Sequence, residues 1–251
     1  MRPKSDVPAL QRALQTLEAV REAGSEGLSP AKLIERVSAP RASLYRIVRE
    51  LLEAGLLAQD AHTGRYRLGR QSVYLGFSAR ANDPLVLAAQ PLLKSITQQT
   101  HEMSELIVAV SGTQLITLEV WQAEQTPLRF RARAGMLFPV SHTTAHGLIY
   151  LSYAGERRMN EYLSSDLGKA APAGLIESCE RWRKLGYAWL RQKTPLGNAR
   201  LSVPVFDPRS KTRRVAATLG VACDSAHIDG LQAARWAPIL QARARELEKA
   251  L

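Results

Sequence analysis

The stretch from Pro40 to Leu52 has a composition that suits binding to a nucleic acid, because basic and hydroxyl residues alternate with apolar ones at helical spacing. The apolar stripe consists of Leu44, Ile47, Val48, Leu51 and Leu52. The opposite face carries Arg41, Ala42, Ser43, Tyr45, Arg46 and Arg49. Arginine can hold guanine through two hydrogen bonds or bind phosphate, and hydroxyl groups suit base edges and the sugar–phosphate backbone. One face of this helix could therefore read DNA while the other packs on a core.

A short helix and a tight break precede this stretch. Ser29 followed by Pro30 predicts a helix start, because serine caps the first turn and proline suits its first position. The helix is expected to end near Arg36. Ser38–Ala39 then separates it from the longer helix, which Pro40 can open.

A glycine and a hairpin follow the longer helix. Gly55 predicts its end, and the segments 56–59 and 65–68 alternate as two strands around a turn at 60–64. The order of short helix, long helix and hairpin is that of a winged helix-turn-helix, whose second helix enters the major groove of DNA. Beyond the longer helix, the predicted DNA contacts are Ser29, His62, Arg65 and Arg67. A basic amphipathic helix alone would more often be a solvated face; the flanking elements favour DNA binding.

Composition is consistent with this prediction but does not establish it. The chain has 251 residues, 45% of them hydrophobic, and a net charge of +11 that suits a polyanionic partner. Two cysteines are too few for a disulfide scaffold. No apolar run is long enough to span a membrane, and the N-terminal residues lack the apolar core of a signal peptide. We therefore expect a cytoplasmic protein.

The pattern changes after residue 70. A helix over 71–83 is predicted to link an N-terminal domain, residues 8–70, to a second domain over 84–251. The strands expected in the second domain lie at 105–110, 114–120, 128–133, 201–206 and 215–223. The helices expected there lie at 84–101, 143–154, 156–163, 175–185 and 229–251. This mixture indicates an α+β fold with a largely antiparallel sheet.

Three segments resemble the IclR family of bacterial transcription regulators. They are LQRALQTLEAV from Leu10 with the later APRASLYRIV, AGMLFPVSHTTAHGLIYLSYA from Ala134, and LSVPVFD from Leu201. The resemblance implies a winged helix-turn-helix followed by a GAF-like domain that binds a small effector. It also implies a homodimer joined through the N-terminal domains, often paired into tetramers, on double-stranded operator DNA with two half-sites.

The resemblance places the effector between the sheet and the helix that follows the Gly-x-x-x-Pro segment. Backbone N–H groups at that helix start could hold a carboxylate. Relatives that bind small oxoacids carry a cysteine where this chain has Arg200, and polar residues where it has Leu219 and Val221. The candidate effector-binding residues are Met103, Leu106, Trp121, Phe138, His142, Thr143, Thr144, Ala145, Asn198, Arg200, Leu219 and Val221.

A two-point pair between Arg200 and a carboxylate, above apolar walls, would suit an aromatic or otherwise bulky carboxylic acid. The alternatives are that Arg200 points outward from its strand and that Trp121 belongs to the core. A further set of arginines alternates on one strand face and fits solvent or an interface better than a ligand: Arg129, Arg131 and Arg133.

No motif for catalysis or cofactor binding is found. The sequence lacks a nucleophile elbow, a phosphate-binding loop, a zinc-protease helix and a dinucleotide-binding loop. His142 and His146 have a spacing that could suit a metal, but no third ligand is evident. Cys223 lies in an apolar strand and is expected to be buried. We therefore predict neither an enzyme, nor a cofactor, nor a metal.

These observations favour a ligand-responsive DNA-binding regulator, controlling a catabolic operon in response to a small carboxylic acid, for which an aromatic acid is one candidate. Two alternatives remain at this stage. One is an enzyme or small-molecule-binding protein with an incidental basic domain. The other is a DNA-architectural protein without an effector, which would show steep salt dependence and little sequence discrimination.

Overall fold

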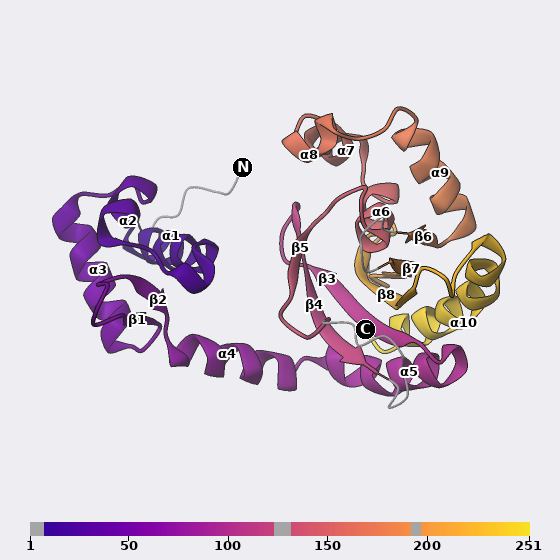
Figure 1. Cartoon of the computed structure of the whole chain (residues 1–251), viewed down its shortest axis with the longest axis horizontal. Helices are drawn as coiled ribbons and strands as arrows, with labels where there is room; N and C mark the ends of the chain where they lie inside the picture. The colour runs from indigo at the N-terminus through magenta and orange to yellow at the C-terminus, as the bar shows by residue number, and fades with distance from the viewer. Residues whose placement is uncertain (1–7, 123–131, 192–196) are drawn as a thin grey trace. The chain divides into compact units, whose positions relative to one another are not determined.

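The chain divides into two compact units, Met1–Ala81 and Asn82–Leu251, and each is described by itself (Figure 1). The computed structural model describes residues 8–122, 132–191 and 197–251. Among these residues, no helix combines the length and apolar character needed to cross a membrane.

The first unit is a small helical domain with a hairpin. Its elements are α1 (Pro8–Glu22), a 3₁₀ turn (Gly24–Glu26), α2 (Pro30–Arg36), α3 (Arg41–Glu53), β1 (Leu57–Gln59), β2 (Tyr66–Leu68) and α4 (Arg70–Ala81). Its core is formed by Ala19, Val20, Leu28, Leu33, Val37, Leu44, Val48, Leu51, Leu57 and Tyr66. The apolar stripe predicted for the longer helix thus packs against α1, α2 and the hairpin.

Two glycines allow the hairpin to join the helices. Gly55 has a φ of +68°, a left-handed conformation that glycine adopts without strain just after a helix. Gly69 lies so close to it that an added Cβ would approach the Gly55 carbonyl oxygen to 2.1 Å. The strands between them pair antiparallel, with Leu57 opposite Leu68. The hairpin is therefore held close to the end of α3.

Among its described residues, the second unit forms a six-stranded antiparallel sheet with the order β5-β4-β3-β8-β7-β6. The strands are β3 (Met103–Ala109), β4 (Gln114–Trp121), β5 (Leu137–Pro139), β6 (Ala188–Arg191), β7 (Asn198–Phe206) and β8 (Val215–Asp224). The helices are α5 (Pro84–Thr100), α6 (Ala145–Ser152), α7 (Glu156–Leu163), α8 (Asp166–Lys169), α9 (Leu175–Leu185) and α10 (Gly230–Glu248).

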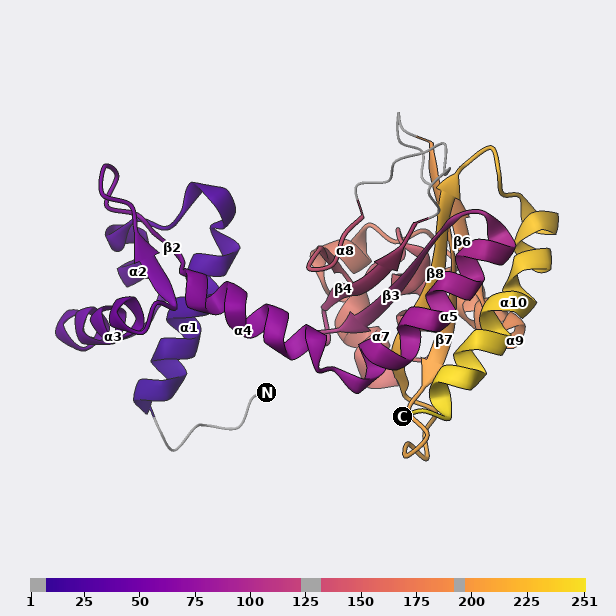
Figure 2. The ribbon, with the colours of Figure 1, turned by 90° about the horizontal axis from the view of Figure 1, so that it is seen from below.

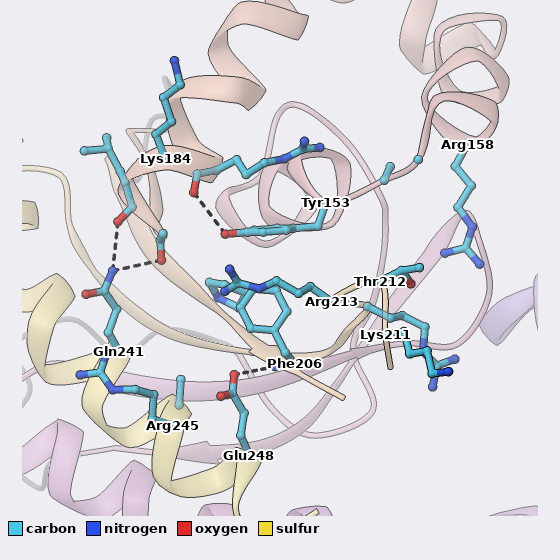
Figure 3. Close-up of a pocket in the computed structure, with 18 residues that line it drawn as sticks. Tyr153, Arg158, Lys184, Phe206, Lys211, Thr212, Arg213, Gln241, Arg245 and Glu248 are labelled. Carbon is cyan, nitrogen blue, oxygen red and sulfur yellow. Dashed lines mark hydrogen bonds between the residues drawn. The ribbon is translucent and has the colours of Figure 1, made fainter. Parts of the chain in front are cut away.

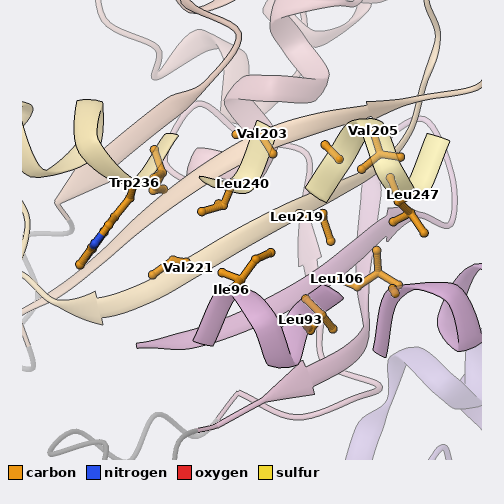
Figure 4. Close-up of a cluster of buried hydrophobic side chains, with 14 of the residues drawn as sticks. Leu93, Ile96, Leu106, Val203, Val205, Leu219, Val221, Trp236, Leu240 and Leu247 are labelled. Carbon is orange, nitrogen blue, oxygen red and sulfur yellow. The ribbon is translucent and has the colours of Figure 1, made fainter. Parts of the chain in front are cut away.

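Two helices cover one face of this sheet. α5 and α10 lie along the same side of the sheet (Figure 2). Their side chains pack with those of β7 and β8 in the main apolar core (Figure 4). Leu93, Ile96, Leu201, Leu219 and Leu240 are each fully buried there. A second apolar cluster brings α6 and α9 against strand residues that include Ile107 and Leu115. The sheet therefore lies between two layers of helices.

The predicted α+β fold with an antiparallel sheet is confirmed. The helices predicted at 156–163 and 175–185 have the observed bounds of α7 and α9, and the helix expected from 143 begins at Ala145. The sequence analysis missed β5, β6 and α8, because three or four residues carry too little periodicity. Most of the strand predicted at 128–133, including Arg129 and Arg131, lies outside the described residues.

Candidate functional site

α3 presents one buried and one exposed face. Leu44, Val48 and Leu51 are buried in the core of the first unit. The residues predicted to contact DNA lie on the solvent side: Arg41, Ala42, Tyr45, Arg46 and Arg49 are exposed, and Ser43 is half-buried. Tyr45 is 51% exposed to solvent, which is high for a large aromatic side chain. The geometry is that of a recognition helix with an open reading face.

The arginines of α3 differ in their surroundings. Arg49 pairs with Glu50 at 3.5 Å and with Glu53 at 3.6 Å, both on its own helix. Within the described part of the chain, no acidic partner is recorded for Arg41 or Arg46. These two guanidinium groups near the start of α3 are therefore free to meet phosphate or guanine.

The hairpin turn is ordered by one carboxylate. Asp60 accepts hydrogen bonds from the backbone N–H groups of His62 at 3.1 Å and Thr63 at 2.8 Å, and from the Thr63 hydroxyl at 2.9 Å. Hydrogen bonds from Thr63, above all, lower the pKa of Asp60. His62 and Arg67 are exposed, and Arg67 lies 3.5 Å from Asp60. The turn therefore holds these two side chains at the surface.

Two residues predicted to contact DNA also have structural roles. Ser29 caps α2 by accepting a hydrogen bond from the Lys32 N–H at 3.3 Å. The Arg65 guanidinium donates to the carbonyl oxygens of Glu26 and Gly27 at 3.3 and 3.4 Å. Arg65 therefore ties the hairpin to the segment before α2, a role that the sequence pattern did not reveal.

A polar cluster is buried on the α6 face of the second unit's sheet. Glu105 on β3 is 1% exposed, and its Oε1 lies 2.9 Å from His146 Nε2 and 2.8 Å from Arg200 Nε. His146 Nδ1, on α6, lies 2.8 Å from the Thr218 hydroxyl and 2.9 Å from the Ser202 hydroxyl. Five side chains from four elements thus satisfy one another at the centre of the sheet.

The charges in this cluster hold Glu105 ionised. Burial alone would raise the pKa of its carboxyl group, but Arg200 and His146 outweigh that effect and lower the pKa to about 2. His146 reaches the sheet because Gly220 opposite it has no side chain: an added Cβ would lie 2.5 Å from the imidazole Cε1. The sequence analysis missed Glu105, although one acid in the apolar run MSELIVAV was the available signal.

Arg200 belongs to this cluster and lies on the face of the sheet that α6 covers. Its side chain is 21% exposed, and Nε binds Glu105, whereas no partner is recorded among the described residues for its terminal nitrogens. Asn198 is two residues earlier on β7 and so shares its face. The Asn198 Oδ1 atom is buried and has no hydrogen-bond partner among the residues that the structure describes. The partly exposed Arg200 guanidinium and this buried oxygen therefore lie on the same side of the same strand.

Four residues predicted to line this site lie elsewhere. Leu106, Leu219 and Val221 are fully buried in the core formed with α5 and α10, and Trp121 packs against that core beneath Lys94. The neighbours Glu105, Thr218 and Gly220 face α6 instead, because successive strand residues point to opposite faces. A site at the Arg200 cluster would therefore use these neighbours in place of the predicted Leu106, Leu219 and Val221. Hydrophobicity could not assign the faces of β8, because both are buried.

The predicted carboxylate cradle before α6 is largely satisfied within the chain. The His142 N–H donates to the Tyr162 hydroxyl at 3.1 Å, the Thr143 N–H to Ser141 Oγ at 3.1 Å, and the Thr144 N–H to the Ser141 carbonyl at 3.3 Å. The Thr144 hydroxyl in turn caps α6. Ala145 is the one of these four whose N–H has no acceptor recorded in the described part of the chain. The cradle stays a prediction, but the N–H groups of His142, Thr143 and Thr144 would have to leave these acceptors to bind a carboxylate.

Two further predicted residues, Met103 and Phe138, lie beside the polar cluster. Met103 shares the strand face of Glu105 and packs with Ala222, and the Phe138 ring lies 6.3 Å from that of His146.

Cys223 is buried, as predicted, and burial raises the pKa of its thiol to about 12. The described residues contain no group of three or more His, Cys, Asp or Glu side chains arranged for a metal.

Comparisons with known proteins agree with this architecture. The family model for the IclR helix-turn-helix domain matches residues 9–61. The model for the C-terminal domain of the bacterial transcriptional regulator IclR matches residues 78–249, which is more than half of the chain. Both models describe DNA-binding regulators, which excludes the alternative of an enzyme.

Individual relatives cover nearly the whole chain. The HTH-type transcriptional regulator XynR of Escherichia coli is 23% identical over 98% of this chain and 97% of its own length. The Pca regulon regulatory protein of Pseudomonas putida is 26% identical over 95% of this chain and 82% of its own. An IclR homologue from Microbacterium hydrocarbonoxydans, solved with 4-hydroxybenzoate, has a TM-score of 0.68 at 23% identity, covering 97% and 98% of the two chains. The chain belongs to the IclR family of bacterial transcriptional regulators.

Proposed function

We propose that this chain regulates a catabolic operon by binding operator DNA through α3 and a small carboxylic acid through Arg200. The observation that carries the effector half is the state of Arg200: Glu105 holds its Nε at 2.8 Å, and its terminal nitrogens are left for a ligand. The homologue solved with 4-hydroxybenzoate supports an aromatic acid as the ligand class.

The arrangement suits a carboxylate for an electrostatic reason. Glu105 is already neutralised by two cationic or hydrogen-bonding partners, so an incoming anion would meet the positive edge of Arg200. A fork of two N–H groups matches a carboxylate in two-point geometry. Asn198 could donate to or accept from the same ligand with its amide. Met103 and Phe138 supply apolar surface beside these groups.

The DNA half of the proposal uses the exposed face of α3 and the hairpin. Arg41 and Arg46 would reach bases or phosphates from the start of the helix, and Ser43 and Tyr45 would add hydroxyl contacts. His62 and Arg67 on the hairpin would contact the flanking backbone. Ser29 and Arg65 would act mainly by fixing the elements that carry these residues.

Self-association is part of the proposal. α4 has no buried residue, and its exposed side chains include Val73, Tyr74, Leu75 and Phe77, each at least half exposed. Leu10 and Leu14 of α1 are similarly exposed. Apolar surface of this extent suggests an interface with a second copy. A homodimer would place two recognition helices on the two half-sites of a palindromic operator, and pairs of dimers would give a tetramer.

The test combines ligand binding and DNA binding on the full chain. Aromatic and aliphatic carboxylic acids are screened by thermal shift, because a ligand of the native state raises its melting temperature. For a hit, Arg200→Ala should abolish the shift and the ligand's effect on operator affinity, while ligand-free operator binding persists. Arg235→Ala removes an exposed arginine elsewhere and should change neither.

A second variant separates binding from folding. Arg200→Lys keeps the charge beside Glu105 but loses the two-point fork, so the ligand-induced shift should fall although the protein stays folded. If Arg200→Ala and Arg200→Lys both respond to the ligand as the unmodified protein does, Arg200 is not the anchor. If saturating ligand leaves operator affinity unchanged, the chain is not regulated through this site.

A further inference from the structure

A separate cavity of about 1040 Å³ lies at one end of the second unit (Figure 3). The C-terminal ends of α9 and α10, the β7–β8 connection and the junction of α6 and α7 surround it. Its cationic lining residues are Arg158, Arg183, Lys184, Lys211, Arg213, Arg214 and Arg245. Glu248 is the one acidic residue that lines it among the described residues. None of the residues proposed above to bind the effector lines this cleft, which we term the basic cleft.

Most of the positive charge in the basic cleft is not neutralised within the chain. Arg214 pairs with Asp207 at 2.8 Å, and Arg183 Nε donates to the Ser152 carbonyl at 2.6 Å. Glu248 is occupied by the Phe206 N–H at 2.8 Å. The cations with neither an acidic partner nor a side-chain hydrogen bond in the described part of the chain are Arg158, Lys184, Lys211, Arg213 and Arg245. Gathering such charges is unfavourable by itself, and an anion bound among them relieves the repulsion.

The helix dipole explains the positions of only some of these cations. Lys184 lies in the last turn of α9 and Arg245 in the last turn of α10, where a cation interacts favourably with the helix dipole. That reason does not apply to Lys211 and Arg213, which lie on the connection between two strands. It does not apply to Arg158 either, because this residue is in the first turn of α7. The excess of charge therefore points to a ligand.

Two aromatic rings form part of the cleft wall and position its cations. Tyr153 and Phe206 meet edge to face, with ring centroids 4.9 Å apart (Figure 3). The Arg213 guanidinium lies over the Phe206 ring at 4.3 Å, and that of Arg183 lies over Tyr153 at 5.8 Å. Stacking holds these groups near the rings while their N–H edges stay available for hydrogen bonds. The wall therefore combines planar apolar surface with several donors.

We propose that the basic cleft binds a small, multiply phosphorylated anion, such as a nucleoside triphosphate or an inorganic polyphosphate. A single carboxylate would use only a fraction of five unpaired cations that come from four separate segments. A chain of phosphates carries several charges and enough oxygens to contact lysine and arginine together. The cavity is also large enough for a ligand of nucleotide size.

The experiment measures binding by isothermal titration calorimetry on the full chain, at about 0.15 M salt so that weak surface attraction is screened. The probes are adenosine triphosphate, inorganic tripolyphosphate and adenosine monophosphate. We expect both triphosphates to bind and the monophosphate to bind much more weakly. If the nucleotide binds more tightly than tripolyphosphate, the base contributes to binding; equal affinity means that the phosphates alone are recognised. Failure of both triphosphates to bind at millimolar concentration overturns the proposal.

A matched pair of double variants locates the site. Lys211→Gln with Arg245→Gln removes two cations of the basic cleft and should weaken triphosphate binding about tenfold or more. Lys169→Gln with Arg235→Gln removes two exposed cations outside the cleft and should have little effect. Equal weakening by both pairs would show a general effect of net charge and overturn the assignment.

One further result would show that the ligand of the basic cleft is a nucleic acid and not a small phosphorylated anion. If a short duplex without an operator displaces the triphosphate, and the cleft variant loses affinity for that duplex as well, the cleft is a nucleic-acid surface and the proposal is wrong. Unchanged melting temperatures in both double variants ensure that any loss of binding is local. Displacement of the triphosphate by the duplex would not bear on the proposed function, because that function assigns operator binding to α3 and effector binding to Arg200.

Discussion

Replacing Glu105 by glutamine tests whether the buried cluster is held together by charge. The substitution keeps the shape of the side chain and removes its negative charge, while Arg200 and His146 remain. The pKa of Glu105 lies at about 2 in the folded protein against 4.5 as its ordinary value. At 1.36 kcal/mol per pH unit, this difference corresponds to about 3 kcal/mol of stability at neutral pH. Glu105→Gln should therefore lower the free energy of unfolding by about that amount at pH 7.

The pH dependence follows from the sign of the shift. A carboxyl group whose pKa is lowered on folding stabilises the protein above its unfolded pKa, and this contribution is lost as the pH falls towards the folded value. The difference between Glu105→Gln and the unmodified protein should shrink from about 3 kcal/mol at pH 7 to about 2 kcal/mol at pH 3.5, and further towards pH 2.

Urea unfolding followed by tryptophan fluorescence measures this difference in the second unit alone. The chain's tryptophans, Trp121, Trp182, Trp189 and Trp236, all lie there. Glu161→Gln serves as the control, because Glu161 pairs with Arg157 on an exposed helix surface, and such pairs contribute little. A destabilisation by Glu105→Gln that is the same at both pH values, or no larger than that of the control, would refute the electrostatic account.

Three further substitutions test other parts of the structure. Arg46→Ala should weaken operator binding by about 1–3 kcal/mol if the side chain reads guanine, measured by fluorescence anisotropy at fixed salt; unchanged affinity removes it from the interface. Gly220→Ala should destabilise the second unit by about 1–3 kcal/mol in the same urea assay, because its Cβ would meet His146. Gly112→Ala, with open space around it, should not. Phe77→Ser should shift the protein towards monomer in analytical ultracentrifugation; an unchanged dimer places the interface away from α4.

The elements that could be predicted from sequence are those fixed by local chemistry. Ser29 and Pro30 mark the start of α2, and the apolar stripe from Leu44 to Leu51 sets the buried face of α3. These signals depend on neighbours within one or two turns, so they survive without knowledge of the rest of the fold. The same reasoning gave the bounds of α7 and α9.

The proposed effector site could be predicted only in part, because its geometry depends on strand register. A shift of one residue turns a strand's side chains to the other face. In β8, both faces are buried, so Leu219 and Gly220 could not be assigned to faces from hydrophobicity alone. The partners of Glu105 are 41 and 95 residues away in sequence, at His146 and Arg200. No local pattern reports such a contact.

If the proposed effector binds at Arg200, the same long-range contacts would give the site a means of transmitting ligand binding. Glu105 joins Arg200 of β7 to His146 of α6 through a single carboxylate oxygen. An anion bound to the outer nitrogens of Arg200 would compete with Glu105 for the same positive charge. Any lengthening of the Arg200–Glu105 contact leaves His146 as the main partner of a fully buried carboxylate, so the hydrogen bonds between α6 and the sheet must readjust. An uncharged ligand of the same shape would lack this effect, so the proposal predicts that the charge of the effector, rather than its size, triggers the response.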